Sequence, residues 1–310
     1  MTKYYFYIDF LKTVAVLFII NSHMDPIYPY KFLATGGALG NALFFAASGF
    51  LMSGKEKNGM FWKKFSMRIY IPLILVNLIY AYNPNKGLIE QFIWPTNFWF
   101  IGAIVLFYIL FYAFEKMNLF IHYKMIFFFL AFIYVVVYVF LLDTDNWVIE
   151  TPGLYNVESY FKLIYYFGIM IMGGVIRKKE FTYKEQQLSI VGWMVSLILL
   201  YMSKYFIVAH KEFMCLQFLN QLFTFSFATS FFIWATKING EWEMMGRKHI
   251  NKIIKNISAI SLELYLVQFP IILVCGKSLF FPISAIAAVV AIVIAAKTLR
   301  IISGFIMKYA

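Results

Sequence analysis

The chain is 310 residues long, with 62% hydrophobic and only 14% charged residues. Soluble domains carry about 25% charged residues, so this composition excludes a cytosolic enzyme, a secreted domain and a disordered protein. The two cysteines exclude a disulfide scaffold, and no cysteine and histidine spacing suits zinc. We therefore expect an integral membrane protein, in which the net charge of +12 reports membrane orientation and not nucleic-acid binding.

Ten segments are apolar over a length close to the roughly 20 residues that a membrane-spanning helix needs. Their apolar runs do not alternate with a period of two, so we predict helices and not barrel strands. The first segment lacks a small-residue cleavage site, so we expect a retained helix and not a signal peptide. The sequence thus predicts an all-α membrane protein in which 1–310 is a single transmembrane domain without an appended soluble domain. The predicted spans are 5–22, 34–53, 68–82, 98–115, 122–142, 160–176, 187–208, 214–236, 257–275 and 279–298.

The positions of lysine and arginine support this number and set the orientation. With the N-terminus in the cytoplasm, twenty of the 27 basic residues fall in inside segments and six at outer ends. Cytoplasmic loops of membrane proteins are enriched in Lys and Arg, so we predict that both termini lie in the cytoplasm. The longest outside loop, 143–159, is acidic. The longest inside loop, 237–256, is basic, and we expect it to lie at the interface and contact anionic lipid.

Ionisable side chains within a span are costly, so each is a candidate for function. Lys12 and His23 are eleven residues apart in the first predicted helix, which places them on nearly the same face, about 16 Å apart along the axis. One helix thus carries a cation near its cytoplasmic end and a titratable imidazole near its outer end. Two simpler interpretations stay open: Lys12 snorkels to the headgroups beside Asp9, and His23 is an ordinary histidine at a helix end.

Three other segments hold unusual residues. Small residues surround Ser48 and Gly49 in the second span, which favours either close approach of a slender ligand or plain helix packing. The basic run with Lys64 and Arg68 precedes the third span, where membrane topology alone also explains it. Glu263 lies within the ninth span and needs a partner or a water-filled cavity. The sequence shows no Ser/His/Asp triad, phosphate loop or metal-binding cluster. Because His23 has no visible nucleophile partner, it indicates group transfer assisted by a general base more than a covalent serine route.

The order of these motifs resembles the membrane-bound acyltransferase family 3, the ten-helix O-acyltransferases of bacterial surface polysaccharides. That family opens with Asp-x-Leu-Arg followed by a histidine, and here the segment from Asp9 to Lys12 leads to His23 at the same spacing. Lys12 keeps the charge of the family's arginine but loses its planar guanidinium. The final motif differs at Gln268, which replaces a histidine, so no role is carried over to that position. The other matches are Phe44–Phe50, Lys64 with Arg68, Ile69 and Pro72, Asn97–Phe100, Tyr165–Gly173 and Ile257–Gln268.

The resemblance implies that an acyl group, most often acetyl, moves from cytoplasmic acetyl-CoA to a hydroxyl of a glycan outside the bacterial cytoplasmic (inner) membrane. His23 is then the general base or the acyl carrier, and Lys12 draws the donor into the helix bundle. No metal is expected. The other expected site residues are Lys64 and Arg68 for the CoA phosphates, Ser48 and Gly49 for the pantetheine arm, and Glu263, Trp99, Tyr265 and Asn41 for the acceptor.

Two other classes of membrane protein stay open on the sequence alone. A transporter or lipid-linked glycan flippase also combines many helices with buried charges, but it typically shows repeated halves or paired broken helices, and the sequence shows neither. A glycan polymerase or ligase usually has a large basic outer loop, whereas the longest outer loop here is acidic. Hydrolysis or exchange of acetyl-CoA by the purified protein would separate an acyltransferase from a transporter.

The charge distribution generates a prediction about topology. Cysteine labelling or reporter fusions should place loops near residues 57, 120, 180 and 250 in the cytoplasm, and loops near 88, 150 and 210 outside. An outside position for the 237–256 loop would contradict the ten-helix prediction, because one missed or extra helix inverts every later loop.

Overall fold

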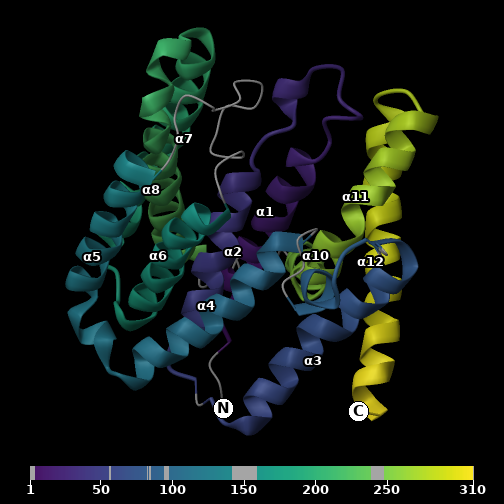
Figure 1. Cartoon of the computed structure of the whole chain (residues 1–310), viewed down its shortest axis with the longest axis horizontal. Helices are drawn as coiled ribbons and strands as arrows, with labels where there is room; N and C mark the ends of the chain where they lie inside the picture. The colour runs from purple at the N-terminus through teal and green to yellow at the C-terminus, as the bar shows by residue number, and fades with distance from the viewer. Residues whose placement is uncertain are drawn as a thin grey trace. The chain divides into compact units, whose positions relative to one another are not determined.

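The computed structural model describes residues 4–55, 57–81, 83, 85–93, 98–141, 159–238 and 248–309. Within these ranges the chain is helical and forms no β-strand (Figure 1). The predicted all-helical fold is therefore confirmed. The predicted acidic outer loop, apart from Ser159, lies outside the described residues, and so does Asn97.

Each of the ten predicted spans corresponds to a helix. One further helix, α10, lies in the segment that the sequence assigned to the long inside loop. Turns of π-helix follow α3 and α5, over Asn77–Ala81 and Val137–Leu141. The helices are α1 (Phe6–Ser22), α2 (Gly37–Met52), α3 (Gly59–Val76), α4 (Trp99–Lys116), α5 (Tyr123–Val136), α6 (Ser159–Lys178), α7 (Tyr183–Ala209), α8 (Phe218–Ala235), α10 (Lys248–Ala259), α11 (Ser261–Ser278) and α12 (Ile283–Tyr309).

Seven helical segments within the described residues are long and apolar enough to cross a membrane. They contain α2, α4, α5, α7, α8, α11 and α12. The other three predicted spans correspond to α1, α3 and α6, which are too short or too charged to be among these seven. Helix α1 has only 17 residues, α3 carries three basic residues, and α6 ends in Arg177 and Lys178. The chain is thus a multi-pass helical membrane protein, while the number ten and the N-in/C-in orientation stay predictions.

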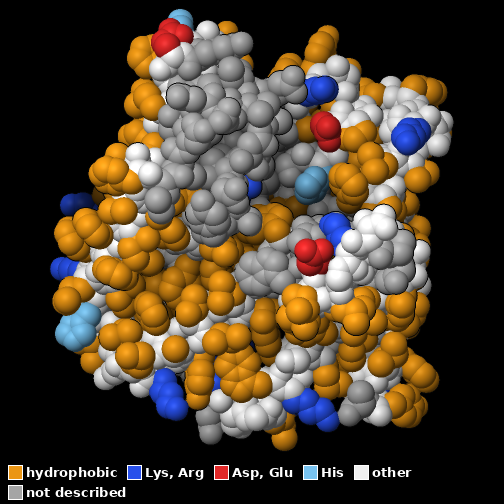
Figure 2. All heavy atoms as spheres, in the orientation of Figure 1, with side chains coloured by type: hydrophobic (Ala, Val, Ile, Leu, Met, Phe, Trp, Pro, Cys, Tyr) orange, Lys and Arg blue, Asp and Glu red, His pale blue; other side chains and the backbone are white. Residues whose placement is uncertain are grey.

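Large apolar side chains on the surface fit a lipid environment. Hydrophobic side chains cover much of the described part of the face shown in Figure 2, and charged side chains are scattered over it. Phe128 on α5 is 77% exposed, and Tyr205 on α7 and Ile301 on α12 are also largely exposed. Monomeric soluble proteins rarely expose apolar patches of this extent, so these helices need lipid contacts to cover them.

The described helices form two compact units that alternate along the chain. Unit 1 comprises 1–41, 55–106 and 246–310, and it contains α1, α3, α10, α11 and α12. Unit 2 comprises 42–54 and 107–245, and it contains α5 to α8. Helices α2 and α4 each contribute residues to both units. The expectation of one transmembrane domain over 1–310 stays a prediction.

Glycines bring α2 and α6 into backbone contact within unit 2. A Cβ atom added at Gly49 would lie 1.8 Å from the carbonyl oxygen of Met170, and one added at Gly173 would lie 1.9 Å from that of Ala46. Real Cβ atoms do not come so close to backbone, so both positions need glycine. The contact favours the packing interpretation of Gly49 over a role beside the pantetheine arm.

This contact generates a stability prediction. Gly49→Ala should lower the free energy of unfolding by about 1–3 kcal/mol or more, because the added methyl group forces α2 and α6 apart. Gly168→Ala is the matched control, since its Cβ would meet only Leu130 at an ordinary 3.8 Å. Thermal unfolding in one detergent, followed by circular dichroism, would compare the two variants. Equal melting temperatures would contradict the packing interpretation.

Candidate active site

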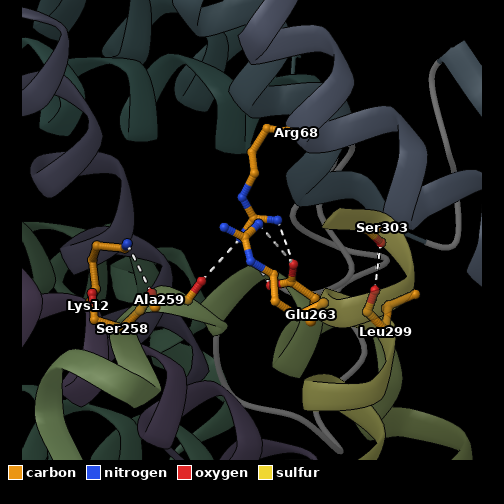
Figure 3. A network of polar contacts seen from close by, with 8 residues as sticks. Lys12, Arg68, Ser258, Ala259, Glu263, Leu299 and Ser303 are labelled. Atoms are coloured by element: carbon orange, nitrogen blue, oxygen red, sulfur yellow. Dashed lines mark hydrogen bonds and ion pairs between the residues drawn. The ribbon is translucent and has the colours of Figure 1, made fainter. Parts of the chain in front are cut away.

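A buried carboxylate lies at the centre of a polar network in unit 1. The side chain of Glu263, in the first turn of α11, has 0% of its surface exposed. The guanidinium of Arg68 on α3 donates two hydrogen bonds to this carboxylate, from Nη1 to Oε1 at 2.5 Å and from Nη2 to Oε2 at 3.0 Å (Figure 3). Two parallel charge-assisted hydrogen bonds of this kind are short and directional. The sequence predicted that Glu263 needs a partner, and that partner is Arg68.

A break in the helical backbone supplies further acceptors to the network. The sequence predicted a continuous span from 257, but α10 ends at Ala259 and α11 begins at Ser261. The last carbonyls of a helix have no partner within it and carry partial negative charge. The carbonyl of Ser258 accepts a hydrogen bond from Lys12 Nζ at 3.1 Å, and that of Ala259 accepts one from Arg68 Nη2 at 3.2 Å (Figure 3). The break therefore stabilises two cations.

Hydrogen bonds of two side chains one turn apart on α1 connect this helix to α10. Asp9 accepts from the hydroxyl of Ser258 at 2.6 Å and from that of Tyr4 at 2.5 Å. The hydroxyl of Thr13 donates to the carbonyl of Ile254 at 3.0 Å. Together with the bond of Lys12, these contacts hold one face of α1 against the end of α10. Lys12 is half-buried with its ammonium on a carbonyl, so the geometry favours a site role for it over snorkelling.

Arg300 joins the network from α12. Its Nη1 atom lies 3.6 Å from Glu263 Oε1, so Glu263 lies between two guanidinium groups. That nitrogen is buried and has no hydrogen-bond partner among the described residues. Three cations, Lys12, Arg68 and Arg300, thus stand against the two carboxylates of Asp9 and Glu263. These cations are only partly buried, but their positive charge exceeds the negative charge of the two carboxylates, so the network is suited to an anionic ligand.

His23 lies apart from this network, at the other end of α1. It caps the helix immediately after Ser22, and its ring meets Phe269 of α11 edge-on at 6.1 Å between centroids. Burial lowers the pKa of His23, and nearby Asp25 partly opposes this effect. A lowered pKa favours the neutral imidazole, which is the form that accepts a proton. Lys12 and His23 thus have different neighbours, Ser258 and Phe269, and their spacing along the helix predicted that they do not touch.

The other predicted site residues do not make described contacts with this network. In unit 1, the ring of Tyr265 packs on Phe98 and Phe100, at 6.2 and 5.5 Å between centroids, and Trp99 packs on Phe100. Lys64 is exposed on α3, one turn before Arg68, and Asn41 is half-buried on α2. Ser48 and Gly49 belong to unit 2, where Ser48 forms a hydrogen bond with the side chain of Tyr108.

Comparison with known families decides the class of protein. A family model described as an acyltransferase domain matches residues 5–299, which is nearly the whole chain. The chain belongs to the membrane-bound acyltransferase family 3. No curated protein and no solved structure matched the chain in the same comparisons. The network around Glu263 and the imidazole of His23 are thus parts of a membrane acyltransferase, and the resemblance that the motifs indicated is confirmed.

Arg300 is the network residue of this acyltransferase that sequence reasoning missed. The tenth predicted span ends at residue 298, so the sequence places Arg300 among the cytoplasmic charges beyond the span. The helix in fact continues to Tyr309. A stripe of small or apolar residues at helical spacing runs past residue 298 and could have predicted the longer helix. Its buried members are Ala288, Ile292, Ala296, Leu299 and Ser303. The sequence places Asp9 beside Lys12 but does not predict its hydrogen bond with Ser258, which is 249 residues away.

The position of Glu263 between two arginines generates a stability prediction. Glu263→Gln should lower the free energy of unfolding by about 3 kcal/mol, because it leaves two guanidinium groups without their counterion in a low dielectric. We expect the low end of the usual range, since the side chains of Arg68 and Arg300 are 30% and 38% exposed.

The matched control for this prediction is Glu212→Gln, which removes an equal charge from an exposed side chain near His210. The control should change stability by less than about 1 kcal/mol. Denaturant unfolding of both variants in one detergent would compare them. Similar losses of stability in Glu263→Gln and Glu212→Gln would show that Glu263 is not the counterion that stabilises the network.

Proposed function

We propose that this membrane acyltransferase transfers an acetyl group from cytoplasmic acetyl-CoA to a hydroxyl group of a glycan on the outer side of a bacterial inner membrane. The main support is the arrangement along α1, which bears the cationic network near one end and a neutral imidazole at the other. A donor that carries phosphates at one end of a flexible arm and a thioester at the other matches a site with these two separated parts.

The cationic network is the proposed site for the donor phosphates. Arg68 is already held by Glu263 and the Ala259 carbonyl, so it would contribute mainly positive charge. Arg300 Nη1 forms an ion pair with Glu263 at 3.6 Å but no hydrogen bond with a described residue, so it could donate one to a phosphate oxygen. Exposed Lys64, one turn from Arg68, would add attraction at longer range. Glu263 then acts as the residue that positions the arginines, and not as a direct contact of the acceptor.

His23 is the proposed base for the transfer step. The acceptor hydroxyl would give its proton to the imidazole as its oxygen attacks the thioester carbonyl. The new C–O bond forms, the C–S bond breaks, and the thiolate of CoA leaves and takes up a proton. A route in which His23 first carries the acetyl group uses the same residue and the same neutral form. Trp99, Tyr265 and Asn41 stay proposals for acceptor contacts.

A transporter is the alternative that one observation favours. At the break between α10 and α11, backbone carbonyls accept hydrogen bonds from Lys12 and Arg68, and broken helices also offer carbonyls to cations in many transporters. Transporters typically pair two broken helices around one site. Within the described parts of unit 1, the carbonyls that accept from Lys12 and Arg68 come from this one break. Acetyl-CoA hydrolysis or exchange by the purified protein would support the acyltransferase proposal, and a lack of both would favour transport.

The separation of Lys12 and His23 generates a kinetic prediction. His23→Ala should reduce turnover by about 100-fold or more and leave donor binding nearly intact, because general-base catalysis contributes roughly 10²–10⁴-fold. Lys12→Ala should mainly raise the apparent KM for acetyl-CoA, and Lys12→Arg should keep substantial activity because it keeps the charge.

Two measurements on folded variants test this division. Direct binding of acetyl-CoA reports the donor site, and mass spectrometry of acetyl groups on surface glycan reports the whole reaction. Wild-type glycan acetylation in His23→Ala would overturn the proposed mechanism. Unchanged acetyl-CoA binding and KM in Lys12→Ala would remove Lys12 from the donor site.

A further inference from the structure

Helix α10 has three edges with different surroundings. One edge is buried in unit 1, where Ile254 and Ser258 face α1. A second edge carries Ile250 and Ile253, which are 45% and 56% exposed. The lysines occupy a third edge, opposite the exposed isoleucines on the helical wheel, and they are Lys248, Lys252 and Lys255. Exposed isoleucines and lysines on opposite edges make α10 strongly amphipathic.

The length and charge of α10 indicate what covers its exposed edges. With 12 residues and three lysines it is too short and too polar to cross a bilayer. No acidic residue occurs between Lys248 and Ala259, and neither Lys248 nor Lys252 forms an ion pair with a described residue. A helix with an apolar edge and an opposite lysine-rich edge lies in the membrane interface, where anionic headgroups meet the lysines.

The C-terminal end of α10 is part of the network around Glu263. Its Ser258 and Ala259 carbonyls accept from Lys12 and Arg68, and its Ile254 carbonyl accepts from Thr13. A rigid helix transmits a shift along its axis to its last turn. A shift of α10 along its axis would therefore move the carbonyl acceptors of both cations.

We propose that α10 is an interfacial helix that docks on anionic phospholipid, and that this docking positions the carbonyl acceptors of Lys12 and Arg68. The exposed isoleucines enter the acyl-chain boundary, while Lys248 and Lys252 bind headgroup phosphates. This interaction with lipid is independent of the donor and the acceptor of the proposed function, and it is tested without either of them.

The test uses the full-length protein in nanodiscs of phosphatidylcholine, with or without phosphatidylglycerol, in the absence of acetyl-CoA. Hydrogen exchange followed by mass spectrometry reports each helix. Amides of α10 and of the first half of α1 should exchange several-fold more slowly when phosphatidylglycerol is present, and high salt should reduce the difference because it screens surface charge.

Matched variants separate lipid docking from a general effect of charge. Lys248→Gln/Lys252→Gln should remove the phosphatidylglycerol effect, since two basic residues near an anionic surface change binding by roughly 30-fold. Lys248→Arg/Lys252→Arg should keep it. Lys116→Gln/Lys184→Gln removes equal charge from exposed sites on α4 and α7 and should also keep it. Ile253→Gln should weaken docking through the apolar edge alone.

Three outcomes would overturn the proposal. Equal exchange of α10 in both nanodiscs would show that anionic lipid does not bind it. Loss of the effect in Lys116→Gln/Lys184→Gln as well would assign it to net charge. Protection of α10 that depends on two protein copies per nanodisc, and not on phosphatidylglycerol, would assign the exposed edges to a protein interface. Protection of α10 without any change in α1 would remove the coupling to Lys12 and leave only the docking.

Discussion

The bidentate pair of Arg68 and Glu263 is the interaction on which the rest of unit 1 depends. It joins α3 to α11 inside a membrane protein, where neither charge is tolerated alone. Arg300 approaches the same carboxylate from α12. One fully buried carboxylate thus links α3 to two consecutive helices, α11 and α12, that lie far from it in the sequence. The proposed donor site depends on the relative positions of these three helices within this unit.

The break between α10 and α11 makes this concentration of cations possible. A continuous helix would use the carbonyls of Ser258 and Ala259 internally. Once the helix ends, the two carbonyls become acceptors for Lys12 and Arg68, and the serine hydroxyl bonds Asp9. Backbone polarity thereby compensates charge that side chains alone leave unbalanced. The remaining surplus positive charge is the physical reason to propose an anionic donor in this family member.

Two groups of different chemistry are separated along α1. Lys12 belongs to the network, whereas His23 lies at the helix end beside an aromatic ring from α11. Because one rigid helix leads from Lys12 to His23, the proposed donor site and the proposed base would keep a constant spacing. Gly49 contributes elsewhere, since it lets α2 and α6 meet at backbone distance within unit 2.

The sequence by itself determined the helical membrane class, the positions of most helices, the family, and the eleven-residue spacing of Lys12 and His23. These properties follow from composition, apolar run length and local periodicity, which act within one segment. Only the tertiary structure decided that Arg68 and Arg300 share Glu263, that the helix breaks at Ile260, and that Gly49 fills a helix contact. Arg68 and Glu263 are 195 residues apart, and no glycine or proline lies near Ile260. Such features depend on which helices pack together, and local periodicity does not contain that information.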